Sequence, residues 1–177
     1  MTPPTWPATL PPPREPGRPY RVCLVCLGNI CRSPMAEAVL RAELDRAGLA
    51  AVVEVDSAGT GDWHVGGRMD PRARAELSRR GYDGTAHRAR QILPSWLAGR
   101  DLILAMDQAN LTGLLAMAGP ADRDRIRLLR SFDPAAGGHA EVPDPYYGGS
   151  ASFGDTLGLI EAAVGGLTAA LRAALVS

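Results

Sequence analysis

Residues 22–38 of the chain read VCLVCLGNICRSPMAEA. The segment begins with a run of strand-forming side chains over residues 22–27, which is long enough for one buried strand. Gly28 and Asn29 interrupt this run, because both residues tolerate backbone angles that most others avoid. The stretch therefore predicts a strand that ends in a tight loop.

A helix is expected to begin directly after this loop. Ser33 stands where an N-cap residue belongs, and Pro34 follows at the first helical position, where its missing N–H costs nothing. Apolar residues then recur at helical spacing from Ala36 to Leu44. A helix N-terminus at the end of a tight loop directs successive backbone N–H groups toward one point, so the loop can bind an anion.

Two chemically distinctive side chains belong to this loop. Cys26 provides a thiol, and Arg32 provides a guanidinium six positions later. A thiolate is a strong nucleophile, and the N–H fork of arginine matches two phosphate oxygens. Together with the anion-binding loop, they predict nucleophilic attack on a phosphate ester, in which Arg32 holds the transferring group in line as charge spreads over its oxygens.

Length and charge restrict the remaining function classes. The chain has 177 residues, which suits one domain with a substantial core, and its formal net charge is +0. Neither nucleic acid nor an anionic membrane is therefore expected as a partner. No apolar run is expected to reach the ~20 residues of a membrane span, and no signal-peptide core is recognised at the N-terminus.

The three cysteines all lie in one segment, residues 23–31. An odd number of crowded cysteines does not resemble a disulfide framework, and it suits a reducing cytoplasm, where we expect the protein to be located, with export into a host or medium left open. Cys23 and Cys26 would point to opposite faces of a strand, which is poor geometry for one zinc ion. No metal and no cofactor are therefore expected.

Strand and helix patterns alternate along residues 20–177. This alternation predicts a single α/β domain, a four-stranded parallel sheet with helices on both faces (Rossmann-like or flavodoxin-like). The loop after the first strand lies at the carboxyl end of the sheet, where such folds bind ligands. Strands are expected near 20–26, 52–56, 102–106 and 126–129, and the main helices near 33–47, 70–81, 107–118 and 152–175.

Residues 1–19 are dense in proline and have little to bury. They predict a disordered tail that is partly polyproline II. Docking of this tail on a proline-recognition module is the less favoured alternative.

Four segments also resemble one known family, in the same order along the chain. They read VCLGNICRSP from Val25, DSAGT from Asp56, HRARQ from His87 and DPYYG from Asp144. This pattern is similar to the low-molecular-weight protein tyrosine phosphatases, and the resemblance extends from Tyr20 to about Ala174. It implies that family's fold and metal-free hydrolysis of phosphotyrosine through a phosphocysteine at Cys26, with a phosphotyrosine-containing protein as partner. A monomer is expected, with weak self-association left open.

The resemblance also implies roles for residues outside the first loop. Asp144 becomes the general acid, a role that typically contributes ~10²–10⁴ in rate, although Asp-Pro by itself is an ordinary turn. Tyr146 and Tyr147 become aromatic walls for the substrate ring and sites that can be phosphorylated. Trp63 lies on the opposite loop and is expected to shape substrate choice.

Further family roles fall within and beneath the loop. The resemblance assigns phosphate binding to the positions around the nucleophile, which are Leu27, Gly28, Asn29, Ile30, Cys31 and Ser33. Asn29, with an expected positive φ, forms a supporting hydrogen-bond network with Ser57 and His87. Cys31 can pair with Cys26 under oxidation, as a reversible protection of the nucleophile. Asp107 matches a family acid of structural role and is expected to cap a helix.

Four rival functions receive less support from the sequence. Protein-arginine phosphatases of the same fold carry Thr where this chain has Ile30, and arsenate reductases need further cysteines, which are absent after Cys31. A P-loop NTPase lacks support because no Gly-Lys-Ser/Thr follows Gly28. The non-enzymatic alternative is a phosphotyrosine-binding module, which the combination of Cys26, Arg32 and Asp144 disfavours.

Overall fold

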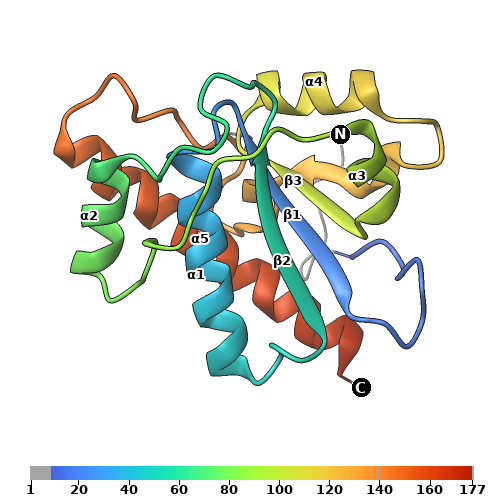
Figure 1. Ribbon diagram of the computed structural model, residues 1–177. Helices are drawn as coiled ribbons and strands as arrows, with labels where there is room; N and C mark the ends of the chain where they lie inside the picture. Colours follow the sequence, from blue (N-terminus) through green and yellow to red (C-terminus); the bar gives the residue numbers. More distant parts are fainter. Residues whose placement is uncertain (1–8, 139, 177) are drawn as a thin grey trace.

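A computed structural model describes residues 9–138 and 140–176, and its centre is a parallel four-stranded sheet (Figure 1). The sheet has the order β2-β1-β3-β4. Its strands are β1 (Tyr20–Cys26), β2 (Val53–Gly59), β3 (Leu102–Ala105) and β4 (Ile126–Leu128). Neighbouring strands are parallel throughout, as in the pairing of Val22 with Leu102. The expected α/β architecture is confirmed.

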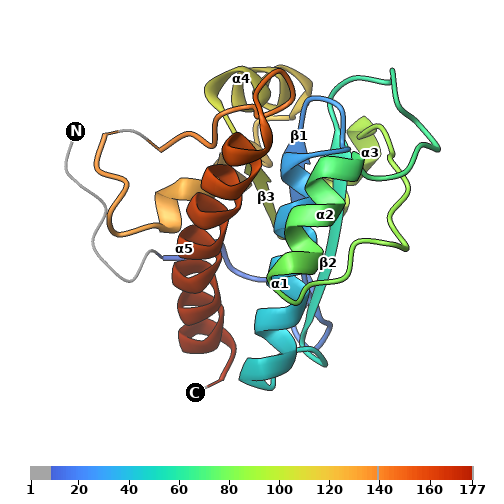
Figure 2. The same cartoon turned by 90° about the vertical axis from the view of Figure 1, so that its left-hand side faces the viewer.

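Helices cover both faces of the sheet, as Figures 1 and 2 show. One face carries α1 (Arg32–Ala47) and α5 (Ser150–Leu175), with α2 (Pro71–Arg79) packed against both. The other face carries α3 (Pro94–Gly99) and α4 (Gln108–Met117), and short 3₁₀ turns, η1 (Arg123–Arg125) and η2 (Leu129–Phe132), flank β4.

Strand β1 separates the two halves of the hydrophobic core. Val22 and Leu24 belong to the cluster under α1 and α5, whereas Cys23 and Val25 belong to the cluster under α3 and α4. All four side chains are fully buried. This alternation follows from the two-residue period of a strand, and it explains why a central parallel strand is apolar at every position.

Helix α5 is the longest helix, and by length and composition alone Ser152–Leu175 is apolar enough to cross a membrane. The expectation that no apolar stretch reaches the length of a membrane span is therefore wrong. Its Leu157, Ile160 and Leu167 are fully buried in the cluster that α5 shares with α1. The helix is apolar because it closes one side of the core.

The helix starts agree with the sequence in most places. Asp70 and Asp107 cap α2 and α4 with their carboxylates, and Gly48 ends α1 in the left-handed conformation, with φ of 72°. Helix α1, however, begins at Arg32, with Cys31 at the N-cap position, and no side-chain cap is present there. The N-cap assignment of Ser33 is therefore wrong, because its hydroxyl lies against the Cys26 sulfur instead.

The segment 9–19, which we call the N-terminal strap, is packed at the amino ends of the strands. The Tyr20 hydroxyl donates to the carbonyl of Pro11 at 2.9 Å, and the backbone N–H of Arg14 donates to Asp101 at 2.7 Å. Prolines lack N–H groups but keep their carbonyls, and Arg125 binds that of Pro12 at 2.8 Å. The prediction of disorder is wrong for residues 9–19, and residues 1–8 lie outside the described residues.

Candidate active site

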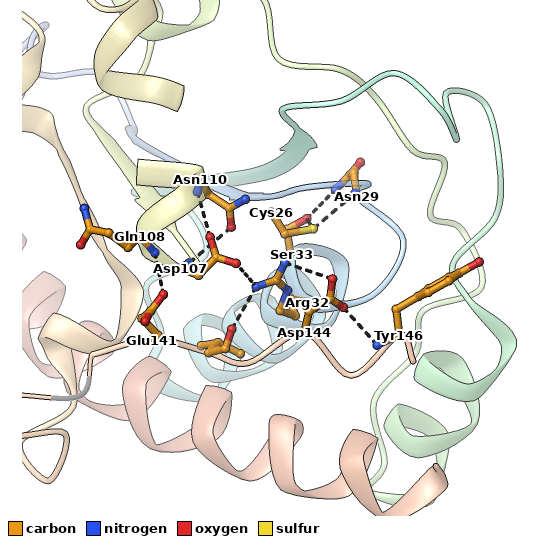
Figure 3. Close-up of polar contacts among 11 residues, drawn as sticks. Cys26, Asn29, Arg32, Ser33, Asp107, Gln108, Asn110, Glu141, Asp144 and Tyr146 are labelled. Atoms are coloured by element: carbon orange, nitrogen blue, oxygen red, sulfur yellow. Dashed lines mark hydrogen bonds and ion pairs between the residues drawn. The ribbon is translucent and has the colours of Figure 1, made fainter. Parts of the chain in front are cut away.

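The loop that joins β1 to α1 forms the floor of the site, and we call residues 26–33 the phosphate loop (Figure 3). Asn29 has a φ of 57°, and it is the only residue other than glycine with positive φ in the described part of the chain. This conformation was expected at Asn29, because asparagine tolerates the left-handed region better than most residues.

The sulfur of Cys26 lies at the centre of this loop. The Asn29 backbone N–H donates to Sγ at 3.3 Å, and the Ser33 hydroxyl lies 3.0 Å from it. The residue is almost completely buried, yet it lines the cavity described below. An N–H and a hydroxyl next to the sulfur are contacts that suit a thiolate, the nucleophilic form of cysteine.

Asn29 also anchors the loop from beneath. Its side-chain amide donates to the hydroxyls of Ser33 at 2.8 Å and Ser57 at 3.0 Å, and its Oδ1 accepts the backbone N–H of Arg90 at 2.9 Å. Its backbone carbonyl accepts from Nε2 of His87 at 2.7 Å. The structure thus brings Ser57 and His87 together around Asn29, and it adds a backbone contact from Arg90 that the sequence did not indicate.

The environment of His87 favours the neutral form of its ring. Burial lowers the pKa of His87 below its ordinary value, although the hydrogen bond to the Asn29 carbonyl acts in the opposite direction. Since a carbonyl only accepts, Nε2 carries the proton of the neutral ring.

Arg32 is buried, and two contacts orient its guanidinium. Its Nη1 donates to Oδ2 of Asp107 at 2.6 Å and to the carbonyl of Val142 at 3.0 Å, while Nη2 lies 3.5 Å from Oδ2 of Asp144 (Figure 3). Asp107 is itself held by a reciprocal capping box with Asn110. The guanidinium is therefore fixed before any anion binds, which suits recognition of phosphate oxygens.

Asp144 lies on the loop that leads to α5, and we call residues 142–148 the acid loop. Its Oδ1 accepts the backbone N–H of Tyr146 at 3.0 Å, and its Oδ2 faces Arg32. The side chain is partly exposed at 40%. A carboxyl group in this place can exchange protons both with solvent and with a ligand in the cavity.

One cavity of about 420 Å³ joins these groups. Cys26, Arg32 and Asp144 all line it. Of the other residues expected to bind phosphate, Leu27, Gly28, Ile30 and Cys31 line it as well, whereas the side chains of Asn29 and Ser33 lie behind the loop. The remaining wall of the cavity comes from Trp63, His64, Tyr146 and Tyr147. The volume suits a small ligand or one amino-acid side chain.

Residues 21–176 match the sequence model of the family described as low molecular weight phosphotyrosine protein phosphatase. This chain belongs to that family. A low molecular weight protein-tyrosine-phosphatase of Streptomyces coelicolor is 56% identical over 156 residues, which are 86% of this chain and 94% of the relative.

Solved structures agree with this assignment. The crystal structure of a protein tyrosine phosphatase from Entamoeba histolytica, with Hepes in the active site, has a TM-score of 0.83 at 35% identity and covers 87% of this chain and 97% of that one. The arginine phosphatase YwlE, as a mutant with a phosphorylated active-site serine, has a TM-score of 0.78 at 28% identity and covers 86% and 95%. The phosphotyrosine and phosphoarginine phosphatases therefore share this fold.

In this low-molecular-weight phosphatase, the outer wall of the cavity is aromatic. We call Trp63, Tyr146 and Tyr147 the aromatic rim. Trp63 is 69% exposed and Tyr147 is 95% exposed, whereas Tyr146 is more covered and meets Tyr147 edge-on at 4.9 Å between ring centroids. All three expected substrate-lining residues thus lie at the cavity.

Sequence reasoning missed His64, which also lines the cavity. Its ring packs over Gly28, where an added Cβ would approach a ring carbon to 3.0 Å, and it lies 6.5 Å from the Tyr146 ring. The signal was its place beside Trp63. The absent side chain at Gly28 makes room for the ring.

Cys31 shares the cavity with Cys26. Burial, reinforced by Asp70, raises the pKa of the Cys31 thiol well above its ordinary value, so it stays protonated at neutral pH. Its oxidative pairing with Cys26 stays a prediction. Across the described part of the chain, no group of three or more His, Cys, Asp or Glu residues could hold a metal ion.

Proposed function

We propose that this protein hydrolyses phosphotyrosine in protein substrates through a phosphocysteine intermediate at Cys26. The observation that carries the proposal is the convergence of three groups on one cavity: the sulfur of Cys26, the fixed guanidinium of Arg32 and the carboxyl of Asp144. Membership of a family of phosphotyrosine phosphatases supports the same reaction.

The first half of the reaction transfers the phosphoryl group to sulfur. The phosphate enters the phosphate loop, where backbone N–H groups and Arg32 bind its oxygens. The Cys26 thiolate attacks phosphorus, an S–P bond forms and the bond to the tyrosine oxygen breaks. Protonated Asp144 donates its proton to the leaving phenolate, which would otherwise depart as a strong base.

The second half releases phosphate. Asp144, now ionised, accepts a proton from a water molecule that attacks phosphorus. The S–P bond breaks, inorganic phosphate leaves and the Cys26 thiolate is regenerated. Asp107 and the Val142 carbonyl keep Arg32 in line through both halves, so its stabilisation of the transferring group needs no reorganisation.

Phosphotyrosine is favoured over phosphoarginine by the walls of the cavity. Ile30 lines it with an apolar side chain, which offers no hydrogen bond to a guanidinium. The aromatic rim presents faces and edges that suit a phenyl ring. The similarity to an arginine phosphatase makes phosphoarginine the second candidate substrate.

We also propose a cytoplasmic location, with a protein as the substrate. The three cysteines are free thiols, which suits a reducing compartment. The exposed rings of Trp63 and Tyr147 are accessible to peptide residues next to the phosphorylated one.

The test is steady-state hydrolysis of phosphotyrosine, phosphoserine and phosphoarginine peptides with a chelator present. We expect turnover of phosphotyrosine, and a loss of roughly 10³-fold or more in Cys26→Ser. Cys23→Ala is the matched control, because this thiol lies on the same strand but on the other face of the sheet, and it should retain turnover.

Other results would redirect the assignment. A preference for phosphoarginine would move the chain to the second substrate class. Binding of phosphotyrosine without turnover in the wild-type protein would favour a binding module. Undiminished turnover by Cys26→Ser would contradict the phosphocysteine mechanism.

A further inference from the structure

A continuous series of contacts joins the phosphate loop to the acid loop through helix α2. It begins at Ile30, whose carbonyl accepts the backbone N–H of Asp70 at 2.9 Å. It passes from Asp70 to Arg72 and ends at Tyr146 and Gly148. In Figure 1, α2 lies beside the start of α5, where the acid loop ends.

The first part of the series is a closely bound ion pair. Oδ1 of Asp70 accepts the backbone N–H of Arg72 at 2.8 Å and its Nε–H at 3.2 Å, and Oδ2 accepts Nη2–H at 3.0 Å. Asp70 is almost fully buried. Burial opposes its ionisation, but the hydrogen bonds from Arg72 outweigh burial and lower the pKa of Asp70 below its ordinary value.

The second part of the series reaches the acid loop. Nη1 of Arg72 donates to the carbonyl of Gly148 at 3.3 Å. The guanidinium carbon lies 5.5 Å from the ring centroid of Tyr146 and 4.7 Å from that of Phe153, a buried residue in the first turns of α5. Arg72 therefore contacts both the aromatic rim and the fixed end of the acid loop.

Asp144 lies between two arginine contacts as a result. At one end of the acid loop, Arg32 binds the Val142 carbonyl, and at the other end Arg72 binds the Gly148 carbonyl. Asp144 itself accepts the backbone N–H of Tyr146, whose ring Arg72 covers. The placement of this carboxyl thus depends on the backbone that Arg72 holds.

We propose that Arg72 is a positioning residue that sets the reach of Asp144 toward the leaving-group oxygen. This inference rests on the proposed function. Arg72 does not line the cavity, so it acts through Tyr146 and Gly148 rather than by touching substrate. The role needs arginine, because one planar group binds a carboxylate with two N–H donors, a carbonyl with a third, and aromatic rings with its faces.

The experiment compares two aryl phosphates that differ in their need for a proton. Phenyl phosphate has a basic leaving group that needs a proton, whereas the 2,4-dinitrophenolate of 2,4-dinitrophenyl phosphate leaves without protonation. For Arg72→Ala we expect kcat/KM to fall about 10-fold or more with phenyl phosphate and less than about 3-fold with the dinitrophenyl ester, because only the first uses the acid.

Two further variants sharpen this test. Arg74→Ala is the matched control, since it removes an arginine of the same helix for which no side-chain hydrogen bond or ion pair is found within the described residues, and it should leave both rates unchanged. Arg72→Lys retains the charge but cannot make all of the guanidinium contacts, so it should show the same selective loss in smaller size.

A double variant separates positioning from general damage. In an Asp144→Asn background, Arg72→Ala should lower kcat/KM for phenyl phosphate by less than about 2-fold, because a residue that acts through Asp144 has nothing left to position. Selective loss in the single variant together with this non-additivity would support the proposal.

The opposite outcomes would overturn it. Equal losses with the two esters, losses no larger than those of Arg74→Ala, or full additivity with Asp144→Asn would each remove Arg72 from this role. Failure of the wild-type protein to hydrolyse either ester would instead contradict the proposed function, so the two failures are distinguishable.

Discussion

The phosphate loop and the aromatic rim face each other across one cavity, but they differ in how firmly they are held. Asn29, Arg32 and Ser33 are buried, and each takes part in at least two side-chain hydrogen bonds. Trp63 and Tyr147 are largely exposed, and neither makes a side-chain hydrogen bond within the described residues.

This difference separates chemistry from recognition. Donors that are fixed before the substrate arrives stabilise developing charge without reorganisation, so the phosphate loop suits the reacting group. Exposed rings that can change rotamer suit varied peptide segments around it. Asp144 is the exception, because it is a reacting group carried by the same loop as two rim residues.

The largest expected loss of activity comes from substitution of Asp144. For Asp144→Asn, we expect kcat/KM with phenyl phosphate to fall by roughly 10²–10⁴, and with 2,4-dinitrophenyl phosphate much less, since only the first leaving group needs a proton. Asp62→Asn is the control, because Asp62 is an exposed acid near Trp63. Equal losses with both esters would remove Asp144 from the acid role.

Asn29→Ala should disrupt the firmly held region, the phosphate loop. It leaves the hydroxyl of Ser57 and the backbone N–H of Arg90 without the partner they have now, and it places alanine at a φ of 57°. We expect unfolding free energy to fall by about 2 kcal/mol or more, and kcat/KM to fall roughly 10–10²-fold.

Asn29→Gly separates the two causes. Glycine accepts the backbone angle but also lacks the amide, so denaturant unfolding should show part of the stability restored while kcat/KM stays low. Complete recovery of activity in Asn29→Gly would mean that the backbone conformation alone shapes the loop.

Tyr147→Ala tests the exposed side and should have a smaller effect. Its ring lines the cavity but makes no polar contact among the described residues, so its loss should weaken the binding of substrate and of transition state equally. We expect KM for a phosphotyrosine peptide to rise about 2–5-fold with kcat unchanged. A parallel fall in kcat would assign this ring a role in the chemical step.

The smallest effect is a pH dependence from His87. Its pKa is lowered in the folded protein, so the unfolded chain binds the extra proton first as pH falls below the ordinary value of about 6.5. Its contribution to stability is therefore complete above that pH and is lost as pH falls through the lower, folded value.

Urea midpoints at pH 7 and pH 5 provide the measurement. The wild-type midpoint should decrease more between these values than that of His87→Gln, which can keep a donor near the Asn29 carbonyl but does not titrate. An identical decrease in both proteins would show that His87 does not contribute to acid sensitivity.

The phosphate loop was predictable because its residues act on one another locally. Gly28, Asn29 and Pro34 have backbone preferences that predict the turn and the helix start directly. Cys26 and Arg32 are only six positions apart, so the loop between them brings them together. Ser33 was assigned wrongly as the N-cap because a hydroxyl at a helix start can either cap the helix or bind a neighbouring group, and here it lies 3.0 Å from the Cys26 sulfur.

Contacts between distant segments were not predictable from local pattern. Arg72 reads as one more surface arginine until α2 is placed beside the acid loop, 76 positions further on. The strap was misjudged because proline content predicts weak self-structure but says nothing of carbonyls that Arg125 can bind. Arg14 reaches Asp101 across 87 positions, which only the folded chain reveals.

Because side chains alternate along β1, its two thiols, Cys23 and Cys26, lie on opposite faces of the sheet and differ in their access to solvent. Cys26 borders the open cavity, whereas Cys23 is sealed between the sheet and the helices α3 and α4. An alkylating reagent applied to the native protein should therefore modify the nucleophile first and leave Cys23 intact. The rate at which Cys23 is alkylated then measures how often the central strand opens. The extent of alkylation at Cys26 in the same sample measures the fraction of active sites that are competent.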